Sequence, residues 1–251
     1  MNLAATRTVR ELALEAPGAT RVFERYGIDY CCGGNKSLQD ACAASNLELE
    51  EIVQSLESAL SKDNSREAQP FASGSLAELM EHIRQKHHKY TREESVRLGA
   101  LFEKVCSVHG ARHVELLHAR DEFRNLARDL STHMMKEEIV LFPYIERMEE
   151  AVMEGGPILP APFGTVQNPV AAMAREHDSA GDLLRRLRSL TNGYTPPADA
   201  CVSYQTLYSA LEEFERDLHQ HIHLENNILF PRAIEMERGR QSLVTVTVPS
   251  V

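Results

Sequence analysis

An internal repeat limits the folds open to this chain. The segment HMMKEEIVLFP (residues 133–143) is matched 88 positions later by HIHLENNILFP (residues 221–231), with His, Glu, Leu, Phe and Pro in the same places. A repeat of this period indicates two helical hairpins of similar build, not a solenoid of many short units. The helices that carry the two copies, the second and the fourth, are therefore expected to play equivalent roles.

Four long helical patterns accommodate this repeat. Their approximate limits are Ser75 to Gly110, Ala111 to Glu150, Asn168 to Gly193, and Asp199 to Arg238. Ser75 and Glu78 form a capping box, and Asn168-Pro169 resembles an N-cap followed by a proline at the first helical position. A helix of 30 residues is about 45 Å long, which suits a bundle. The tail SLVTVTVPSV alternates as a strand does, but it has no partner strand.

The residues before the bundle divide into two parts. Residues 1–60 contain short amphipathic stretches with caps at Thr8 and Ser37 and a stop at Gly27, which indicate a small helical domain. Residues 61–74 are polar with Pro and Gly, as in a linker. The predicted fold class is all-α, with an N-terminal helical domain (1–60), a linker (61–74) and a C-terminal antiparallel four-helix bundle (75–240).

Charge and hydropathy exclude several classes of protein. The net charge of −10 argues against a nucleic-acid partner, because phosphate contacts need a clustered basic face. No run of about 18 apolar residues is present, so no membrane span is expected. Residues 1–10 have no apolar stretch of the signal-peptide kind. The five cysteines include no CxxC pair and are expected to be thiols. These features together predict a cytoplasmic protein.

Each repeat copy contains a histidine and a glutamate four residues apart, His133 with Glu137 and His221 with Glu225. This spacing places both side chains on one helix face, with Cβ atoms about 5–6 Å apart. A single His-x-x-x-Glu is more often a solvated polar pair than a pair of ligands. Two copies with identical Leu-Phe-Pro continuations favour ligands.

The other two helices can each add a histidine. The third helix contains His177, and the first contains His87 and His88. His88, His133, His177 and His221 are separated by 45, 44 and 44 residues. Regular spacing by one hairpin arm brings one histidine from each helix to a similar height in mid-bundle, where a core site can form. On the first helix, apolar periodicity alone would choose His87.

Four imidazoles and two carboxylates suit first-row transition metals with mixed nitrogen and oxygen ligands. Two metals bridged by two carboxylates, with two histidines each, would use every ligand and leave room for an oxo bridge or an open position. The order of His before Glu departs from the Glu-x-x-His pattern of ferritin-type sites.

Five segments of the sequence together form a specific combination: DYCCGG (29–34), HHKYTREE (87–94), HMMKEE (133–138), EHD (176–178) and HIHLENNILFPR (221–232). This combination resembles that of the RIC ("repair of iron centres") family of di-iron proteins with a hemerythrin-like domain. It implies two non-haem iron ions, oxo- and carboxylate-bridged, and it places the first-helix ligand at the second of the two histidines. The implied ligands are His88, His133, Glu137, His177, His221 and Glu225. Oxygen-carrying hemerythrins are similar in fold but place a histidine where this chain has Glu225.

Residues outside the ligand set have alternative roles. Cys31 and Cys32 precede Gly33-Gly34 and a helix start, where a thiol has a lowered pKa and is reactive; alternatively they are small apolar residues. The resemblance favours thiols that accept iron, nitric oxide or a cluster fragment. Glu176 and Asp129 are either surface charges or carboxylates that orient the ligands. The remaining cysteines, Cys42, Cys106 and Cys201, are predicted to lie in the core.

By resemblance, the protein repairs iron–sulfur clusters damaged by nitrosative or oxidative stress, by donating iron to the damaged iron–sulfur proteins. Two alternatives stay open: reduction of nitric oxide to nitrous oxide at the di-iron site, and binding of dioxygen or nitric oxide as a sensor or carrier. Whether the protein is an enzyme is therefore undecided. A homodimer is compatible with the sequence.

Overall fold

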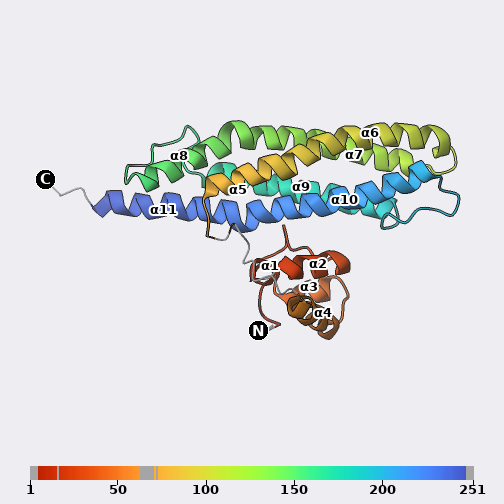
Figure 1. The fold of residues 1–251 in the computed structure, drawn as a ribbon, viewed down its shortest axis with the longest axis horizontal. Helices are drawn as coiled ribbons and strands as arrows, with labels where there is room; N and C mark the ends of the chain where they lie inside the picture. Colours follow the sequence, from red (N-terminus) through yellow and green to blue (C-terminus); the bar gives the residue numbers. More distant parts are fainter. Residues whose placement is uncertain (1–4, 16, 63–70, 72, 247–251) are drawn as a thin grey trace.

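The computed structural model describes residues 5–15, 17–62, 71 and 73–246, and it confirms the all-α prediction. Every regular element among these residues is a helix (Figure 1). Four long rods lie side by side, and a compact group of short helices packs on one flank. Within the described residues, no helix is long and apolar enough to span a bilayer.

Each rod is antiparallel to the rod that precedes it in the chain. The first consists of α5 (Leu76–His82), η1 (Ile83–His88) and α6 (Lys89–His109), and the second of α7 (Glu115–Lys136), η2 (Glu137–Leu141) and α8 (Phe142–Met153). The third is α9 (Gln167–Leu190), and the fourth is α10 (Val202–Leu224), η3 (Glu225–Leu229) and α11 (Phe230–Val246). The start of α5 therefore lies beside α8, and α6 lies beside α10.

Two apolar clusters fill the bundle, and a polar layer separates them. One cluster includes Leu98, Leu130, Ala180 and Ile222, and the other includes Ile83, Leu141, Met173 and Ile228. Along every rod, the predicted ligands fall between a residue of one cluster and a residue of the other. Apolar packing on both sides thus holds the six predicted ligands of the four rods at one height.

The α-helical pattern is interrupted by a π-turn at this height in three rods. The segment η1 ends at His88, η2 begins at Glu137, and η3 begins at Glu225. Such wide turns are rare and concentrate at functional sites, because the extra residue reorients the side chains beside it. Pro143 and Pro231 follow the π-turns, and both helices continue beyond them.

The second helix of each hairpin caps the first. Glu149 accepts hydrogen bonds from the backbone N–H of Leu76 (2.6 Å) and Ala77 (2.9 Å) at the start of α5. Glu237, 88 positions later, accepts one from the N–H of Val166 (3.1 Å) before α9. Both carboxylates are buried. Each carboxylate accepts from backbone N–H groups that have no partner within their own helix, and its negative charge lies at the positive end of the helix dipole. Because the two glutamates are 88 positions apart and have the same role, the repeat extends beyond the recognised motif.

The N-terminal group contains α1 (Val9–Glu15), α2 (Pro17–Tyr26), α3 (Leu38–Ala44) and α4 (Leu49–Lys62). The predicted caps are confirmed. Thr8 Oγ1 accepts from the N–H of Glu11 (3.1 Å), Ser37 Oγ accepts from the N–H of Asp40 (3.1 Å), and Gly27 ends α2 with a φ of +66°. These helices enclose an apolar core of their own.

One local prediction was wrong. Asn168 does not cap the third rod: α9 follows Val166, whose N–H bonds Glu237, while the Asn168 amide donates to the Phe163 carbonyl (2.8 Å). The C-terminal tail, whose sequence alternates as a strand does, is helical through Val246, and residues 247–251 lie outside the described residues. Most of the expected linker, 63–70 and 72, also lies outside them, so the domain limits stay a prediction.

Candidate metal centre

The six residues predicted as ligands converge in the middle of the bundle. Ligand atoms of His88, Glu137, His221 and Glu225 lie within 4.8 Å of one another, and so do those of a second group that shares both glutamates and adds His133 and His177. All six side chains are 0–3% exposed. Two four-residue groups with two common carboxylates form the arrangement that a pair of bridged metal ions requires.

The two neighbouring histidines of the first rod have different surroundings. His88 Nε2 lies 3.1 Å from His221 Nε2 and 3.4 Å from Glu137 Oε2. His87 is also buried, but its Nδ1 pairs with Asp217 (3.0 Å), and its ring stacks on the outer side of His221. The structure therefore brings His88 into the group and leaves His87 outside. The π-turn in η1 is the feature that apolar periodicity could not anticipate.

The spacing of the donor atoms suits metal ions. His133 Nε2 and His177 Nε2 are 3.0 Å apart, close to the 3.1 Å of the other histidine pair. Two ligand atoms that are each roughly 2.1 Å from one ion, at about a right angle, are about 3 Å apart. Both oxygens of Glu137 and Oε2 of Glu225 are buried without a hydrogen bond. Buried carboxylate oxygens need a compensating partner, and a cation between the four helices would supply one.

Three of the four histidines have their other ring nitrogen fixed. His88 Nδ1 lies 2.7 Å from Glu138 Oε1, and His133 Nδ1 lies 2.9 Å from Glu176 Oε2. His177 Nδ1 lies 2.9 Å from the Asn226 side-chain oxygen. Because these oxygens act as acceptors, each Nδ1 carries a proton and each Nε2 faces the site, where it can bind a metal ion once it holds no proton of its own. The fourth, His221, has a buried Nδ1 with no hydrogen-bond partner among the described residues.

The repeat makes the two halves nearly equivalent. Glu138 and Asn226 stand at matching positions, and each binds a histidine of a rod that precedes it in the chain. The next aromatic residues match as well, since Phe142 stacks on His88 (5.8 Å) and Phe230 on His177 (5.9 Å). The sequence prediction missed Glu138 and Asn226. Their place directly after the two predicted glutamates was the available signal.

The two carboxylates that the sequence left open differ. Glu176 binds His133 and forms an ion pair with Lys136, so it orients a histidine of the group. Asp129 pairs with Arg128 (3.2 Å) and lines a pocket of about 290 Å³ that reaches His133. It makes no hydrogen bond to the histidines.

Without metal, the site balances charges internally. Burial alone would lower the pKa of His88, but Glu137 and Glu225 outweigh it and raise that pKa to about 10. The pKa of His133 is raised to about 9 against the same effect of burial. Burial would raise the pKa of Glu225, yet the neighbouring histidines hold it well below the usual value. Metal ions must therefore displace protons from the histidines.

The predicted thiols lie in a loop between the two parts of the molecule. Asp29 folds the loop by accepting from the N–H groups of Cys31 (3.2 Å) and Cys32 (2.9 Å). A Cβ on Gly34 would come within 2.8 Å of the Tyr30 carbonyl, so only glycine permits this turn. Sulfur and carboxylate atoms of Asp29, Cys31 and Cys32 lie within 4.8 Å of one another and form a third group able to hold a metal.

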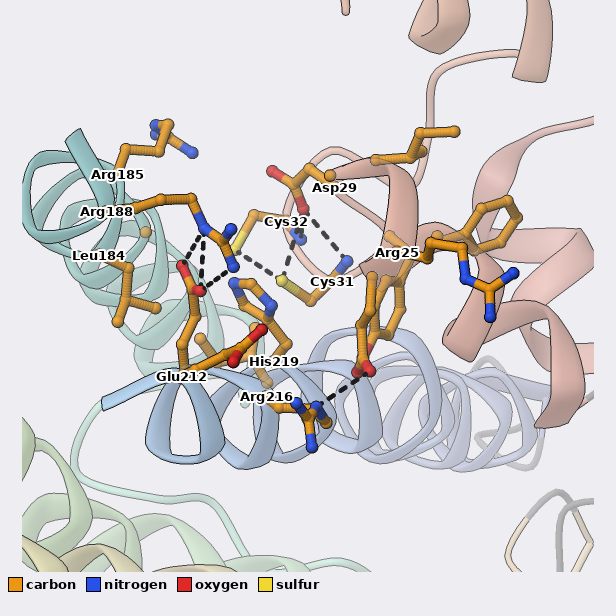
Figure 2. Close-up of a pocket in the computed structure, with 18 of the residues that line it drawn as sticks. Arg25, Asp29, Cys31, Cys32, Leu184, Arg185, Arg188, Glu212, Arg216 and His219 are labelled. Carbon is orange, nitrogen blue, oxygen red and sulfur yellow. Dashed lines mark hydrogen bonds and ion pairs between the residues drawn. The ribbon is translucent and has the colours of Figure 1, made fainter. Parts of the chain in front are cut away.

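The expectation of two reactive, low-pKa thiols needs correction. Cys31 is buried, and the pKa of its thiol is raised by the hydrogen bond to the Cys32 sulfur and by burial. Cys32 is half-buried and lines a pocket of about 480 Å³. Figure 2 shows this pocket between the loop and helices α9 and α10, with Arg185, Arg188 and His219 beside the sulfurs. Cys32 is thus the thiol that a small molecule can reach.

The other cysteines follow the prediction in two of three cases. Cys42 and Cys106 are buried. Cys201 is exposed at the start of α10, where its sulfur lies 3.2 Å from His109 Nε2. Sequence spacing did not reveal that residues 109 and 201 meet, because they lie on different rods.

Comparison with known proteins agrees with this geometry. Residues 81–233 match the family described as "Hemerythrin HHE cation binding domain", and residues 5–60 match ScdA_N, a domain of unknown function. A probable iron-sulfur cluster repair protein of Haemophilus influenzae is 39% identical over 230 residues, which cover 92% of this chain and 97% of the relative. The iron-sulfur cluster repair protein YtfE of Citrobacter koseri is 35% identical over 90% of this chain and 96% of its own length. The chain therefore belongs to the family of iron–sulfur cluster repair proteins with a hemerythrin-like domain.

Proposed function

We propose that this protein is a di-iron protein that repairs damaged iron–sulfur clusters by donating iron. The observation that carries the proposal is the pair of buried His/Glu groups with two shared glutamates. In this proposal His88 and His221 would hold one iron, His133 and His177 would hold the other, and Glu137 and Glu225 would be shared by both. The names of the relatives support the repair role.

The protein side chains define what the site can do. Glu138, Glu176 and Asn226 keep three imidazoles in the tautomer that donates through Nε2. The two apolar clusters exclude bulk water from above and below. Bound iron would supply redox chemistry toward small ligands and a store of metal for transfer.

Transfer of iron needs a receiving group, and the thiol loop is suited to this role. Cys31, Cys32 and Asp29 form a group of sulfur and oxygen donors at the surface of the bundle. Thiolates bind iron and exchange with the sulfur ligands of a cluster. The pocket of about 480 Å³ beside Cys32 gives access to this group.

A second candidate function is reduction of nitric oxide to nitrous oxide. One observation favours it: the pocket of about 290 Å³ is lined by His133, His177, Lys136 and Glu176, so it opens beside one half of the site. A pocket of this size admits a diatomic molecule. The same feature would serve a sensor or carrier of nitric oxide or dioxygen.

Two parallel assays on the iron-loaded protein separate these functions. The first measures anaerobic recovery of activity by a hydratase whose cluster has been damaged with nitric oxide. The second measures nitrous oxide formed from nitric oxide in the presence of an electron donor. Recovery that scales with iron lost from the protein would support donation. Catalytic nitrous oxide formation without recovery would refute donation and favour the second function. Purified protein with one zinc and no iron, after growth with ample iron, would refute the di-iron assignment.

A further inference from the structure

The two halves of the metal centre differ at one pair of matching positions. After the glutamate, the first repeat copy has Glu138 and the second has Asn226. Both accept a hydrogen bond from a histidine Nδ1, at 2.7 Å and 2.9 Å. A carboxylate is the stronger acceptor for this purpose. The acceptor role alone therefore does not explain the amide in the second half.

The amide of Asn226 has a second bond that a carboxylate could not make. Its Nδ2 donates to the backbone carbonyl of Cys31 (3.1 Å). An amide has both an acceptor oxygen and donor hydrogens, whereas a carboxylate has only acceptors. One side chain thus joins His177 to the loop that contains the two thiols, and only the amide satisfies both ends.

Asn227, the residue that follows Asn226, also connects the N-terminal helices to this half of the bundle. Asn227 Nδ2 donates to the Tyr30 carbonyl (3.0 Å), and Arg10 donates to the Asn227 carbonyl (3.0 Å). That carbonyl is available because Pro231, four residues later, has no N–H. The matching residue of the first copy, Ile139, is 68% exposed. The amide therefore occurs in the half that the thiol loop covers.

We propose that Asn226 is a positioning residue that couples the Cys31–Cys32 loop to the metal centre through His177. When the loop is docked, the amide is held at both ends and fixes the His177 ring for metal binding. When the loop leaves, for example toward a client protein, the amide loses its acceptor, and His177 loses a fixed partner. Metal on that half is then held less tightly at the moment when the thiols can receive it. This inference rests on the proposed role of His177 as a ligand.

Coupling of this kind is reciprocal, so metal must also affect the loop. The test measures amide hydrogen exchange of residues 31–34 in the full chain, with and without iron(II) loaded anaerobically. One hydrogen bond is worth a factor of roughly 2 to 10 in an opening equilibrium, so iron should slow exchange in the loop by about that factor. Equal exchange in the two forms would overturn the proposal.

The variant Asn226→Asp separates coupling from simple docking. It keeps an acceptor for His177 but removes the donor to Cys31. We expect it to lose the iron-dependence of loop exchange. A purely structural role would instead speed exchange equally with and without iron, and that result would overturn the proposal. The matched control is Glu138→Gln in the first half. It should weaken iron binding without changing the response of the loop.

The reverse measurement remains decisive if Asn226→Asp folds poorly. Gly34→Ala places a methyl group against the Tyr30 carbonyl and 3.1 Å from Arg10 Cβ, so the loop must shift. Iron release to a chelator should then be about 2 to 10 times faster, whereas Gly99→Ala, which meets nothing within 4 Å, should release iron at the normal rate. Unchanged release from Gly34→Ala would overturn the coupling. Retention of both irons by His177→Ala would instead refute the ligand assignment itself.

Discussion

Metal binding to the metal-free protein should release nearly two protons per chain at pH 8. The protons come from His88 and His133, whose pKa values are raised to about 10 and about 9. At pH 8 these rings are about 99% and about 91% protonated, which gives about 1.9 protons, because a ligand imidazole must be neutral. Glu137 and Glu225 contribute none, since nearby histidines keep their pKa values lowered despite burial.

The assay is an anaerobic titration with iron(II) in weakly buffered solution that contains a pH indicator. The apparent affinity for metal should increase as pH rises from 7 to 9, because fewer protons must be displaced from the histidines. The matched control is His223→Ala. Burial lowers the pKa of His223 to about 4, and the residue lies outside both ligand groups, so the proton count should not change. Release of less than about one proton would refute the charge distribution described for the metal-free site.

Three further predictions concern the ligands, the thiols and the domains. His221→Ala should lose most of its iron while His223→Ala keeps it, since His223 bonds Asn227 and packs on Tyr30; the reverse in metal analysis would contradict the repeat argument. The double variant Cys31→Ser, Cys32→Ser should keep its iron but reactivate a damaged cluster enzyme more slowly, and equal reactivation would remove the thiols from the mechanism. Residues 75–251 alone should fold and bind iron, with release about 2 to 10 times faster because the bond to Cys31 is missing; a fragment without iron would show that the N-terminal helices complete the site.

Much of the centre could be predicted from the sequence because the relevant signals are local. A spacing of four residues places His133 with Glu137, and His221 with Glu225, on one helix face whatever surrounds the helix. The 88-residue repeat added the relation between the two hairpins, and one histidine per arm predicted a common height. These inferences need only helix geometry and the antiparallel order of the rods.

The contacts that orient the ligands depended on tertiary structure. Two features bring His88 rather than His87 into the metal centre. One is the π-turn in η1, and the other is Asp217 on the fourth rod, whose carboxylate pairs with His87. The acceptors Glu138 and Asn226 bind histidines 50 and 49 residues away. Helix rotation and packing decide which side chains meet over such separations, and neither is encoded in the spacing along one helix.

The thiol loop illustrates the same division. The sequence DYCCGG by itself determined that two adjacent thiols are followed by two glycines, whereas the close approach of Gly34 to the Tyr30 carbonyl is a property of the folded loop. Burial of Cys31 against the bundle, and its link to His177 through Asn226, were decided only when the N-terminal helices packed on α10 and η3. A thiol's exposure and its hydrogen-bond partners set its pKa and its reactivity. Both the exposure and the partners are properties of the folded chain.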